Sequence, residues 1–278
     1  MKIDSHHHLW HYNEAEYDWI DDFMSILQRD FLSDELENQL NDATMDGSVV
    51  VQARQSLQET VWLCQLADSN DYIKGVVGWI DLCAANLPAQ LEVFKRYKKL
   101  KGFRHVLQGE SDDFMARPSF IAGLKQLAKM GYRYDLLILS HQLPAAIKML
   151  SKVPELDVVI DHIAKPMIKT GENFEQWKTG MARLADNPKV HCKISGMVTE
   201  ADWVKWKHQD FAPYMNTIYQ LFGPQRILFG SDWPVCLVAA KYKEVQDVVN
   251  TFFNHLPQKE QQLIWGENAI RFYKLSEK

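Results

Sequence analysis

The segment IDSHHHLW, residues 3–10, separates two fold classes that would suit this chain. It joins a short apolar run to three consecutive histidines. In an extended strand alternate side chains share a face, so His6 and His8 would point one way and His7 the other. A doubly wound sheet usually carries a glycine-rich turn here, where backbone amides meet a phosphate. Because the turn HHHLW suits no phosphate, we expect another arrangement of parallel strands.

Outward from this segment, short apolar runs alternate with longer amphipathic segments, which indicates parallel strands joined by helices. We expect strands at Lys2–His8, Ser48–Gln52, Gly75–Asp81, Gly102–Val106, Tyr134–Leu139, Val158–His162, Val190–Ser195 and Arg226–Ser231. We expect helices at Ser33–Ala43, Leu57–Asn70, Ala85–Tyr97, Ser119–Met130, Leu143–Val153, Phe174–Ala185, Phe211–Phe222 and Tyr242–His255. Repeated strand–helix units over roughly 250 residues are typical of a TIM barrel.

We therefore predict an α/β protein, a (β/α)8 TIM barrel that forms a single domain over residues 1–278. The segment Tyr12–Leu32 is long, acidic and rich in Trp and Tyr, and we expect it to lie as a loop over the barrel mouth. A final helix at Gln258–Leu275 is expected to pack on the outside of the barrel.

The composition is that of a soluble globular protein, with 46% hydrophobic and 24% charged residues and a formal net charge of −5. The absence of a basic block argues against a nucleic-acid partner. No apolar run reaches the roughly 20 residues of a membrane helix, and no signal peptide is evident. Four scattered cysteines without a CxxC pair indicate reduced core residues. We expect a cytoplasmic protein with a small-molecule substrate, and the oligomeric state stays open.

Ionisable side chains gather at the ends of the expected strands. In a TIM barrel the carboxyl ends of the strands build the active site. These ends carry Asp4, His6, His8, Gln52, Trp79, Asp81, Arg104, His105, Asp161, His162, Lys193 and Asp232. Imidazoles and carboxylates that converge on one rim can bind a divalent cation or perform acid–base chemistry.

Six motifs follow one another from the first strand to the last helix: IDSHHHLW, GFRH (102–105), DHIAKP (161–166), KISG (193–196), FGSDWPV (229–235) and GENAIRFY (266–273). With these motifs the chain resembles the amidohydrolase superfamily, in particular the branch that contains sugar-acid lactonases and pyrone-dicarboxylate lactonase. The resemblance implies that His6, His8, His162 and Asp232 form the catalytic centre. Asp232 and His162 would be catalytic, and all four would be the ligands of any metal.

The same resemblance makes Gln52, Arg104, His105 and Lys165 candidates for the substrate pocket. Trp10, like Trp79 and Trp233, could stack on a sugar ring, although an aromatic residue near a barrel mouth more often serves packing. Lys193 could contact the substrate or pair with a carboxylate.

The metal content is limited by what strand four offers. Two-metal amidohydrolases use a carboxylated lysine there, whereas this strand ends in Arg104 and His105. We therefore expect at most one divalent ion, zinc or manganese, because three imidazoles and a carboxylate satisfy one four-coordinate ion. Lactonases of this branch do not always need a metal, so metal-independent activity stays open.

The predicted function is hydrolysis of a cyclic ester, in the first place a sugar-acid 1,5-lactone. A dicarboxylate substrate would call for several arginines at the rim, and the sequence offers one, Arg104, with two lysines. Two alternatives stay open: a metal-dependent decarboxylase of the same superfamily, and a catalytically inactive binding barrel. Opening of sugar lactones in a pH-indicator assay would discriminate against the decarboxylase, and the full ligand set at the strand ends argues against the inactive barrel.

Overall fold

The computed structural model describes residues 1–276. It contains eight parallel strands in sequential order. They are β1 (Ile3–His7), β2 (Gly47–Val51), β3 (Ile73–Gly78), β4 (Leu100–Val106), β5 (Arg133–Leu137), β6 (Val158–Ile160), β7 (Val190–Ile194) and β8 (Ile227–Phe229). Just past the end of β8, backbone amides of His8 and Asp232 donate to the carbonyls of Trp233 and His6, at 2.7 and 2.8 Å. The predicted single-domain TIM barrel is confirmed.

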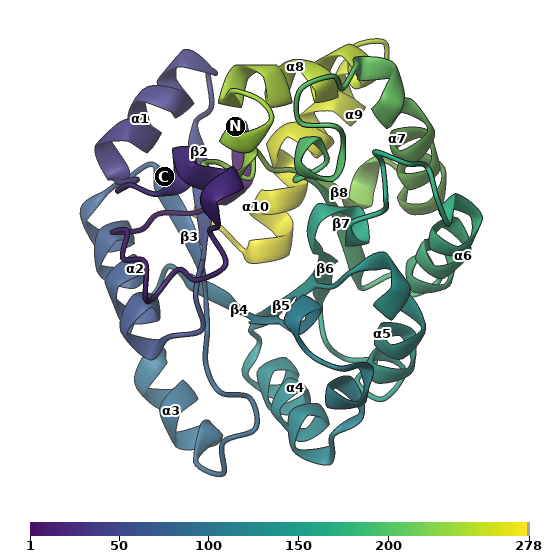
Figure 1. Ribbon diagram of the computed structural model, residues 1–278. Helices are drawn as coiled ribbons and strands as arrows, with labels where there is room; N and C mark the ends of the chain where they lie inside the picture. Colours follow the sequence, from purple (N-terminus) through teal and green to yellow (C-terminus); the bar gives the residue numbers. More distant parts are fainter. Residues whose placement is uncertain (277–278) are drawn as a thin grey trace.

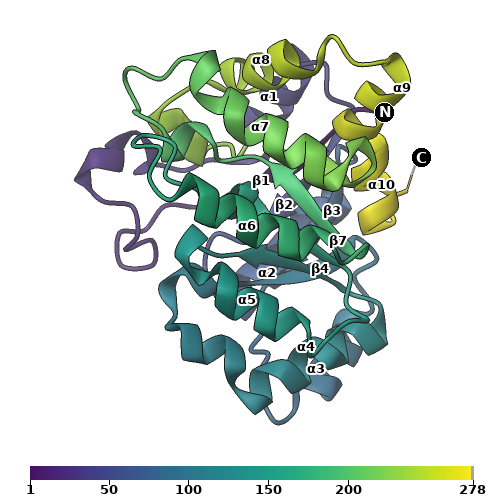
Figure 2. The same ribbon diagram turned by 90° about the vertical axis from the view of Figure 1, so that its right-hand side faces the viewer.

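Helices surround the strands (Figures 1 and 2). They are α1 (Ser33–Asp42), α2 (Leu57–Ser69), α3 (Leu87–Phe94), α4 (Pro118–Met130), α5 (Leu143–Leu150), α6 (Phe174–Ala185), α7 (His208–Phe222), α8 (Tyr242–Phe253), α9 (Gln258–Gln262) and α10 (Asn268–Tyr273). None of the helices within residues 1–276 has the length and apolar character needed to cross a membrane.

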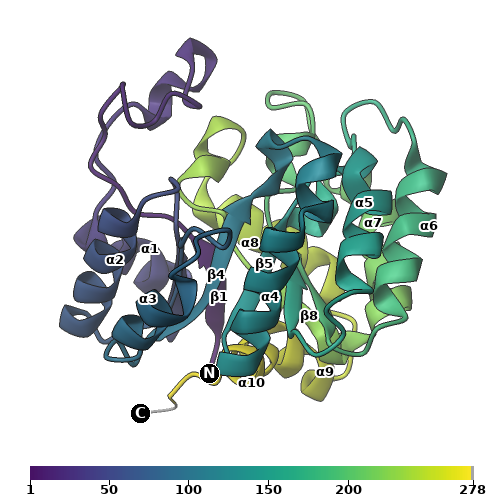
Figure 3. The same ribbon diagram turned by 90° about the horizontal axis from the view of Figure 1, so that it is seen from below.

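The segment predicted as one final helix, Gln258–Leu275, forms α9, a π-helical stretch at Leu263–Glu267, and α10. Figure 3 shows α10 beneath the barrel, at the end where the strands begin. There it packs against strand residues in what we call the basal cluster. Its buried members are Ile3, Val49, Val51, Val77, Val159, Leu228, Ala269, Phe272, Tyr273 and Leu275. The end of the chain therefore closes the floor of the barrel.

Asp4 fastens the seam between β1 and β8. Its carboxylate accepts hydrogen bonds from the Ser231 amide at 2.9 Å, the Ser231 hydroxyl at 2.6 Å and the Tyr242 hydroxyl at 2.9 Å. Complete burial raises the pKa of Asp4 to about 6 despite these donors. Asp4 also accepts a hydrogen bond from the His6 amide at 3.1 Å, and it thus orients the strand that bears the His6 ring.

Residues 12–32 project beyond the opposite end of the barrel, where the strands end (Figure 3). Both ends of this segment are joined, because the amides and carbonyls of Trp10 and Phe31 exchange two hydrogen bonds of 3.0 Å. Trp10 is fully buried beneath the segment and donates from Nε1 to the Arg29 carbonyl at 2.9 Å. The predicted loop over the barrel mouth is present, with Trp10 at its base.

Candidate active site

Two of the site residues lie on irregular backbone beyond the strands. β6 ends at Ile160, so the predicted strand Val158–His162 is two residues too long. His162, Ile163, Ala164 and Lys165 then follow with φ of 53, 49, 59 and 46°, in the left-handed region. Such residues cost about 1–3 kcal/mol each and persist where the surrounding structure holds them. The turn directs the His162 side chain back over the barrel.

Asp232 has a similar setting. β8 ends at Phe229, so the predicted strand Arg226–Ser231 also runs too far, and Asp232 follows with a φ of 59°. Gly196, after β7, makes room for the His162 ring, because a Cβ atom at this position would lie 2.4 Å from His162 Nδ1. His162 and Asp232 thus both reach the site from left-handed backbone just beyond the end of a strand.

His6, His8, His162 and Asp232 converge on one point. The Nε2 atoms of His6 and His8 lie 3.2 Å apart. Asp232 Oδ1 lies 3.5 Å from His8 Nε2 and 3.8 Å from the Nε2 atoms of both His6 and His162. All four side chains are buried. His7, by contrast, points away and contacts the Ser48 hydroxyl at 3.0 Å.

This cluster fits one zinc ion. Ligands at the usual zinc–nitrogen distance in a tetrahedron lie about 3.3 Å from one another. His6, His8 and Asp232 form a group with metal-ligand spacing, and His162 Nε2 lies 3.8 Å from Asp232 Oδ1. His8 Nδ1 lies 2.8 Å from the Val51 carbonyl and His162 Nδ1 lies 2.9 Å from the Ser195 hydroxyl, which leaves Nε2 of each ring for an ion. Burial lowers the pKa of His8 and lowers that of His162 to about 4, so both rings are neutral and able to ligate.

A charged layer lies directly beneath the cluster. Lys193 is completely buried, with its ammonium 2.5 Å from Asp135 Oδ2, 3.0 Å from Asp161 Oδ1 and 3.0 Å from His6 Nδ1. Arg104 Nη1 lies 3.2 Å from Asp161 Oδ2. Burial by itself would raise the pKa of Asp161. Lys193 and His6 outweigh this effect, so the pKa of Asp161 lies well below its ordinary value. His6, Asp161 and His162 form a second group with metal-ligand spacing, but two cations already hold this carboxylate.

Asp135 and Tyr273 were missed by the sequence interpretation. The Tyr273 hydroxyl, from α10, lies 2.8 Å from Asp135 Oδ2 and so ties the charged layer to the floor of the barrel. The one signal for Asp135 was a single acid within the apolar strand YDLLIL. Tyr273 ends the motif GENAIRFY, but nothing in the sequence indicated its contact with Asp135, which joins residues 138 positions apart in the chain.

A cavity of about 740 Å³ opens above the cluster. Among the predicted site residues, His8, His162, Asp232, Arg104 and Lys165 line it. Other lining residues are Glu16, Asp18, Trp19 and Met24 from the projecting segment, and Arg54, Glu200 and Trp203 from neighbouring loops. The segment 12–32 therefore forms part of the wall.

Three predicted substrate contacts lie elsewhere. His105 follows the inward-pointing Arg104 and so points outward, where it lies 2.9 Å from Glu110 and stacks on Phe114. Gln52 is fully buried below the cavity, and its carbonyl accepts a hydrogen bond from Arg104. Trp10 lies under the projecting segment, and neither Trp79 nor Trp233 lines the cavity either. The tryptophans that do line it are Trp19 and Trp203.

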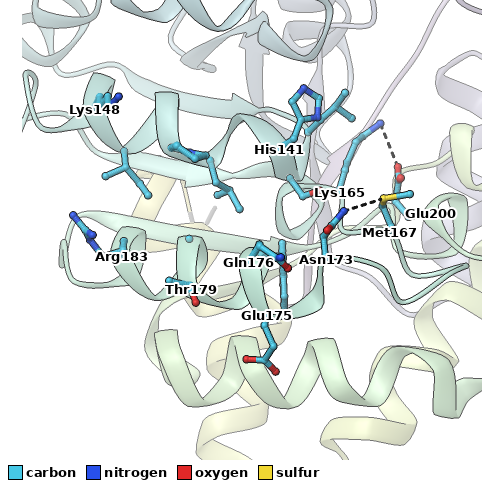
Figure 4. A pocket seen from close by; sticks show the side chains of 17 residues that line it. His141, Lys148, Lys165, Met167, Asn173, Glu175, Gln176, Thr179, Arg183 and Glu200 are labelled. Carbon is cyan, nitrogen blue, oxygen red and sulfur yellow. Dashed lines mark hydrogen bonds and ion pairs between the residues drawn. The ribbon is translucent and has the colours of Figure 1, made fainter.

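A second, larger cavity of about 1090 Å³ lies between α5 and α6, outside the barrel (Figure 4). It is mostly apolar and shares Lys165 and Glu200 with the cavity above the cluster. In Figure 4 the Lys165 ammonium points towards Glu200, 3.5 Å away. His8, His162 and Asp232 line the smaller cavity and do not line this one, so the chemistry belongs to the smaller one.

A parallel barrel with three imidazoles and one carboxylate at the carboxyl ends of its strands defines a class of barrel enzymes that can hold a metal. The chain belongs to the amidohydrolase family, which it matches over residues 3–275.

Two similar proteins match this chain over almost its full length. An L-fucono-1,5-lactonase of Burkholderia multivorans is 38% identical, over 100% of this chain and 97% of that protein. An L-fucono-1,5-lactonase of Burkholderia ambifaria is 31% identical, over 99% of this chain and 96% of that protein. A crystal structure of a B. multivorans amidohydrolase with bound zinc is 38% identical, covers 99% of this chain and 100% of that one, and has a TM-score of 0.96.

Proposed function

We propose that this protein hydrolyses the ring ester of a neutral sugar-acid lactone, of the L-fucono-1,5-lactone type. The observation that supports this best is the convergence of Asp232, His8 and His162 at the floor of an open cavity, with His6 buried against them. The names of the relatives that match over the full chain agree with it.

Asp232 is the proposed base. A water molecule between Asp232 and the lactone gives a proton to the carboxylate while its oxygen forms a bond to the carbonyl carbon. As the ring C–O bond breaks, the same proton passes from Asp232 to the departing alkoxide. Burial by itself would raise the pKa of Asp232, but His162 and His8 outweigh this effect and bring the pKa below its ordinary value. The carboxylate is therefore ionised and able to accept a proton from water.

The carbonyl oxygen gains negative charge during the attack and needs a positive partner. Zinc held by His6, His8, His162 and Asp232 would supply that charge when bound. Without an ion, Arg104 is a cation that lines the cavity and reaches the cluster, with Nη1 3.4 Å from His6 Nε2. A lactone needs less assistance than an amide, because an alkoxide leaves more readily than an amine.

The charges around the cavity favour a neutral substrate. Arg54 Nη1 lies 2.6 Å from Glu16, and Arg104 and Lys165 are likewise paired with Asp161 and Glu200. Within the described lining every lysine and arginine thus has a carboxylate partner, which leaves none to neutralise a substrate carboxylate.

Two tryptophans supply surface for the apolar face of a sugar ring. Trp19 is 39% exposed although it is large and apolar, and it faces the cavity from the projecting segment. Trp203 lines the cavity from the loop that follows β7. Aromatic rings can hold the C–H face of a pyranose-like ring while polar groups bind its hydroxyls.

A lactone screen with a pH indicator tests this function, on protein treated with chelator and on protein supplemented with zinc or manganese. We expect acid release from L-fucono-1,5-lactone or a close stereoisomer, and none from pyrone dicarboxylate. Carbon dioxide from an aromatic acid, with no lactone opened, would refute the proposal in favour of a decarboxylase.

Metal analysis tests the ligand set separately. Protein purified without chelator should contain between none and one divalent ion per chain, since the cluster holds four ligands. The double variant His6→Ala with His8→Ala should lose whatever is bound. Two ions per chain, or an ion that persists without both histidines, would refute the proposed ligands.

A further inference from the structure

His6 meets a donor and an acceptor at the same ring nitrogen. Lys193 Nζ lies 3.0 Å from His6 Nδ1, and Asp161 Oδ1 lies 3.3 Å from that atom. An ammonium group only donates and a carboxylate only accepts. Nδ1 can therefore satisfy Lys193 when it is unprotonated, or Asp161 when it carries a proton, but not both at once.

The second ring nitrogen of His6 decides between them in the metal-free protein. His8 Nδ1 lies 2.8 Å from the Val51 carbonyl, so the proton of neutral His8 is on Nδ1 and its Nε2 is an acceptor. His6 Nε2 lies 3.2 Å from this acceptor. A contact between two such nitrogens needs one proton, and His6 must supply it from Nε2.

The two other neighbours of His6 Nε2 do not change this assignment. Asp232 Oδ1, 3.8 Å away, is an acceptor and also favours a proton on Nε2. Arg104 Nη1 is a donor at the longer distance of 3.4 Å, and it has an acceptor of its own, Asp161 Oδ2, at 3.2 Å. The shortest contact at each end of the ring, to Lys193 and to His8, thus selects the same tautomer. That tautomer has its proton on the nitrogen that would ligate zinc.

We propose that Lys193 and Asp161 make His6 a two-state ligand. Lys193 holds the metal-free tautomer, with the proton on Nε2, and Asp161 accepts the proton at Nδ1 when zinc takes Nε2. His6 is neutral in both states: one proton leaves Nε2 for solvent, one from solvent arrives at Nδ1, and zinc exchanges a water molecule for the nitrogen. The inference rests on the proposed role of His6 as a ligand and not on the identity of the lactone.

Two features of the charged layer support this exchange. Asp161 Oδ1 is buried and, within the described residues, receives no hydrogen bond of good geometry, although Lys193 lies 3.0 Å away. Buried acceptors seldom lack a hydrogen bond, and Asp161 Oδ1 can accept one from His6 Nδ1. Lys193 is also held by Asp135 at 2.5 Å, so it keeps a strong partner when it releases His6.

The proposal predicts opposite effects for the two positioning residues. Lys193→Met removes the donor that opposes the zinc-binding tautomer, together with a buried positive charge, and should tighten zinc binding about tenfold or more. Asp161→Asn must turn its amide oxygen to Arg104 and its NH₂ to His6, so the acceptor at Nδ1 is lost. Zinc binding should then weaken by roughly 10- to 100-fold.

Zinc affinity is measured by competition with a chromophoric chelator, without substrate. Lys189→Met is the matched control, since it removes a lysine that pairs with Glu155 at 3.0 Å on the surface, and its affinity should equal that of the unchanged protein. Because Lys193→Met leaves Asp135 unpaired, the double variant Lys193→Met with Asp135→Asn is prepared beside it. It removes one cation and one anion together and should also bind zinc more tightly.

Nitrogen-15 NMR of histidine-labelled protein locates the proton directly. We expect the His6 proton on Nε2 without metal and on Nδ1 with zinc. Metal-free Asp161→Asn should keep it on Nε2. In metal-free Lys193→Met the Asp161 acceptor at Nδ1 competes with the His8 contact alone, so part of the population should carry the proton on Nδ1. A proton on Nδ1 in the unchanged metal-free protein, or changes of zinc affinity in the same direction for both residues, would overturn the proposal. A protein that opens no lactone would leave these two measurements intact.

Discussion

The barrel interior has two layers of opposite character. The basal cluster, next to α10, contains aliphatic and aromatic side chains alone, apart from the Tyr273 hydroxyl. The charged layer above it contains Lys193, Arg104, Asp135 and Asp161, all of them buried. Burial of ion pairs often costs more than their attraction returns, whereas burial of apolar surface is the main source of folding free energy. The comparison indicates that the lower layer supplies stability, and that the upper layer is retained for chemistry.

Tyr273 joins the two layers. Its ring belongs to the basal cluster, while its hydroxyl lies 3.0 and 2.8 Å from the two oxygens of Asp135. The basal cluster is expected to serve stability and the charged layer to serve chemistry. Substitutions above the charged layer, in the basal cluster and at Tyr273 can therefore test this separation.

The largest expected effect lies above the charged layer. Asp232→Asn keeps the shape of the side chain but removes the basic oxygen, so lactone turnover should fall by roughly 10²- to 10⁴-fold with the fold intact. Turnover is measured alongside circular dichroism. Asp247→Asn, which changes a surface carboxylate of α8 paired with Lys243, is the control and should be fully active. Near-normal turnover in folded Asp232→Asn would remove Asp232 from its role.

In the basal cluster, a substitution is expected to change the stability of the fold and not the turnover. Leu228→Ala opens a cavity in the basal cluster and should lower the free energy of unfolding by about 2–5 kcal/mol, while kcat of the folded protein stays unchanged. Denaturant unfolding measures the first and steady-state kinetics the second. The control is Val204→Ala, at a side chain 88% exposed. A large fall in kcat with normal stability would contradict the separation of the layers.

Tyr273→Phe tests the junction. The change removes a donor from buried Asp135 and should cost about 1–3 kcal/mol of stability, with a smaller effect on turnover than that of Asp232→Asn. Tyr219→Phe removes a partly exposed hydroxyl that donates to Glu260 at 2.7 Å, and it should cost less. Equal losses in the two variants would show that the link through Asp135 adds nothing.

The smallest expected effect lies at the cavity wall. Trp203→Ala should raise KM for the lactone roughly 2- to 10-fold, through loss of an aromatic contact with the sugar ring, and leave kcat nearly unchanged. Trp203→Phe keeps an aromatic face and should restore most of the affinity. An unchanged KM in Trp203→Ala would place the substrate away from this wall.

Sequence periodicity predicted the barrel because apolar strands and amphipathic helices carry a local pattern. The predicted ends of β6 and β8 were wrong, because the backbone turns left-handed at His162 and Asp232. Neither residue is a glycine, so the amino-acid sequence gives no sign of this turn. His6 and His8 were paired correctly by strand alternation. Asp135 and Trp19 escaped detection, since the first depends on a contact with distant Tyr273 and the second lies in an aperiodic loop.

The double hydrogen bond between Trp10 and Phe31 has a consequence for engineering. Because the segment between them starts and ends at one point on the rim, its exposed part can change without moving the strands, as long as the buried core residues Tyr17, Ile20 and Leu27 are kept. Residues 11–30 therefore form an exchangeable cassette that contributes Glu16, Asp18, Trp19 and Met24 to the cavity wall. Transfer of the equivalent segment between lactonases of this family would change which ring substituents are accepted while the catalytic cluster is inherited intact.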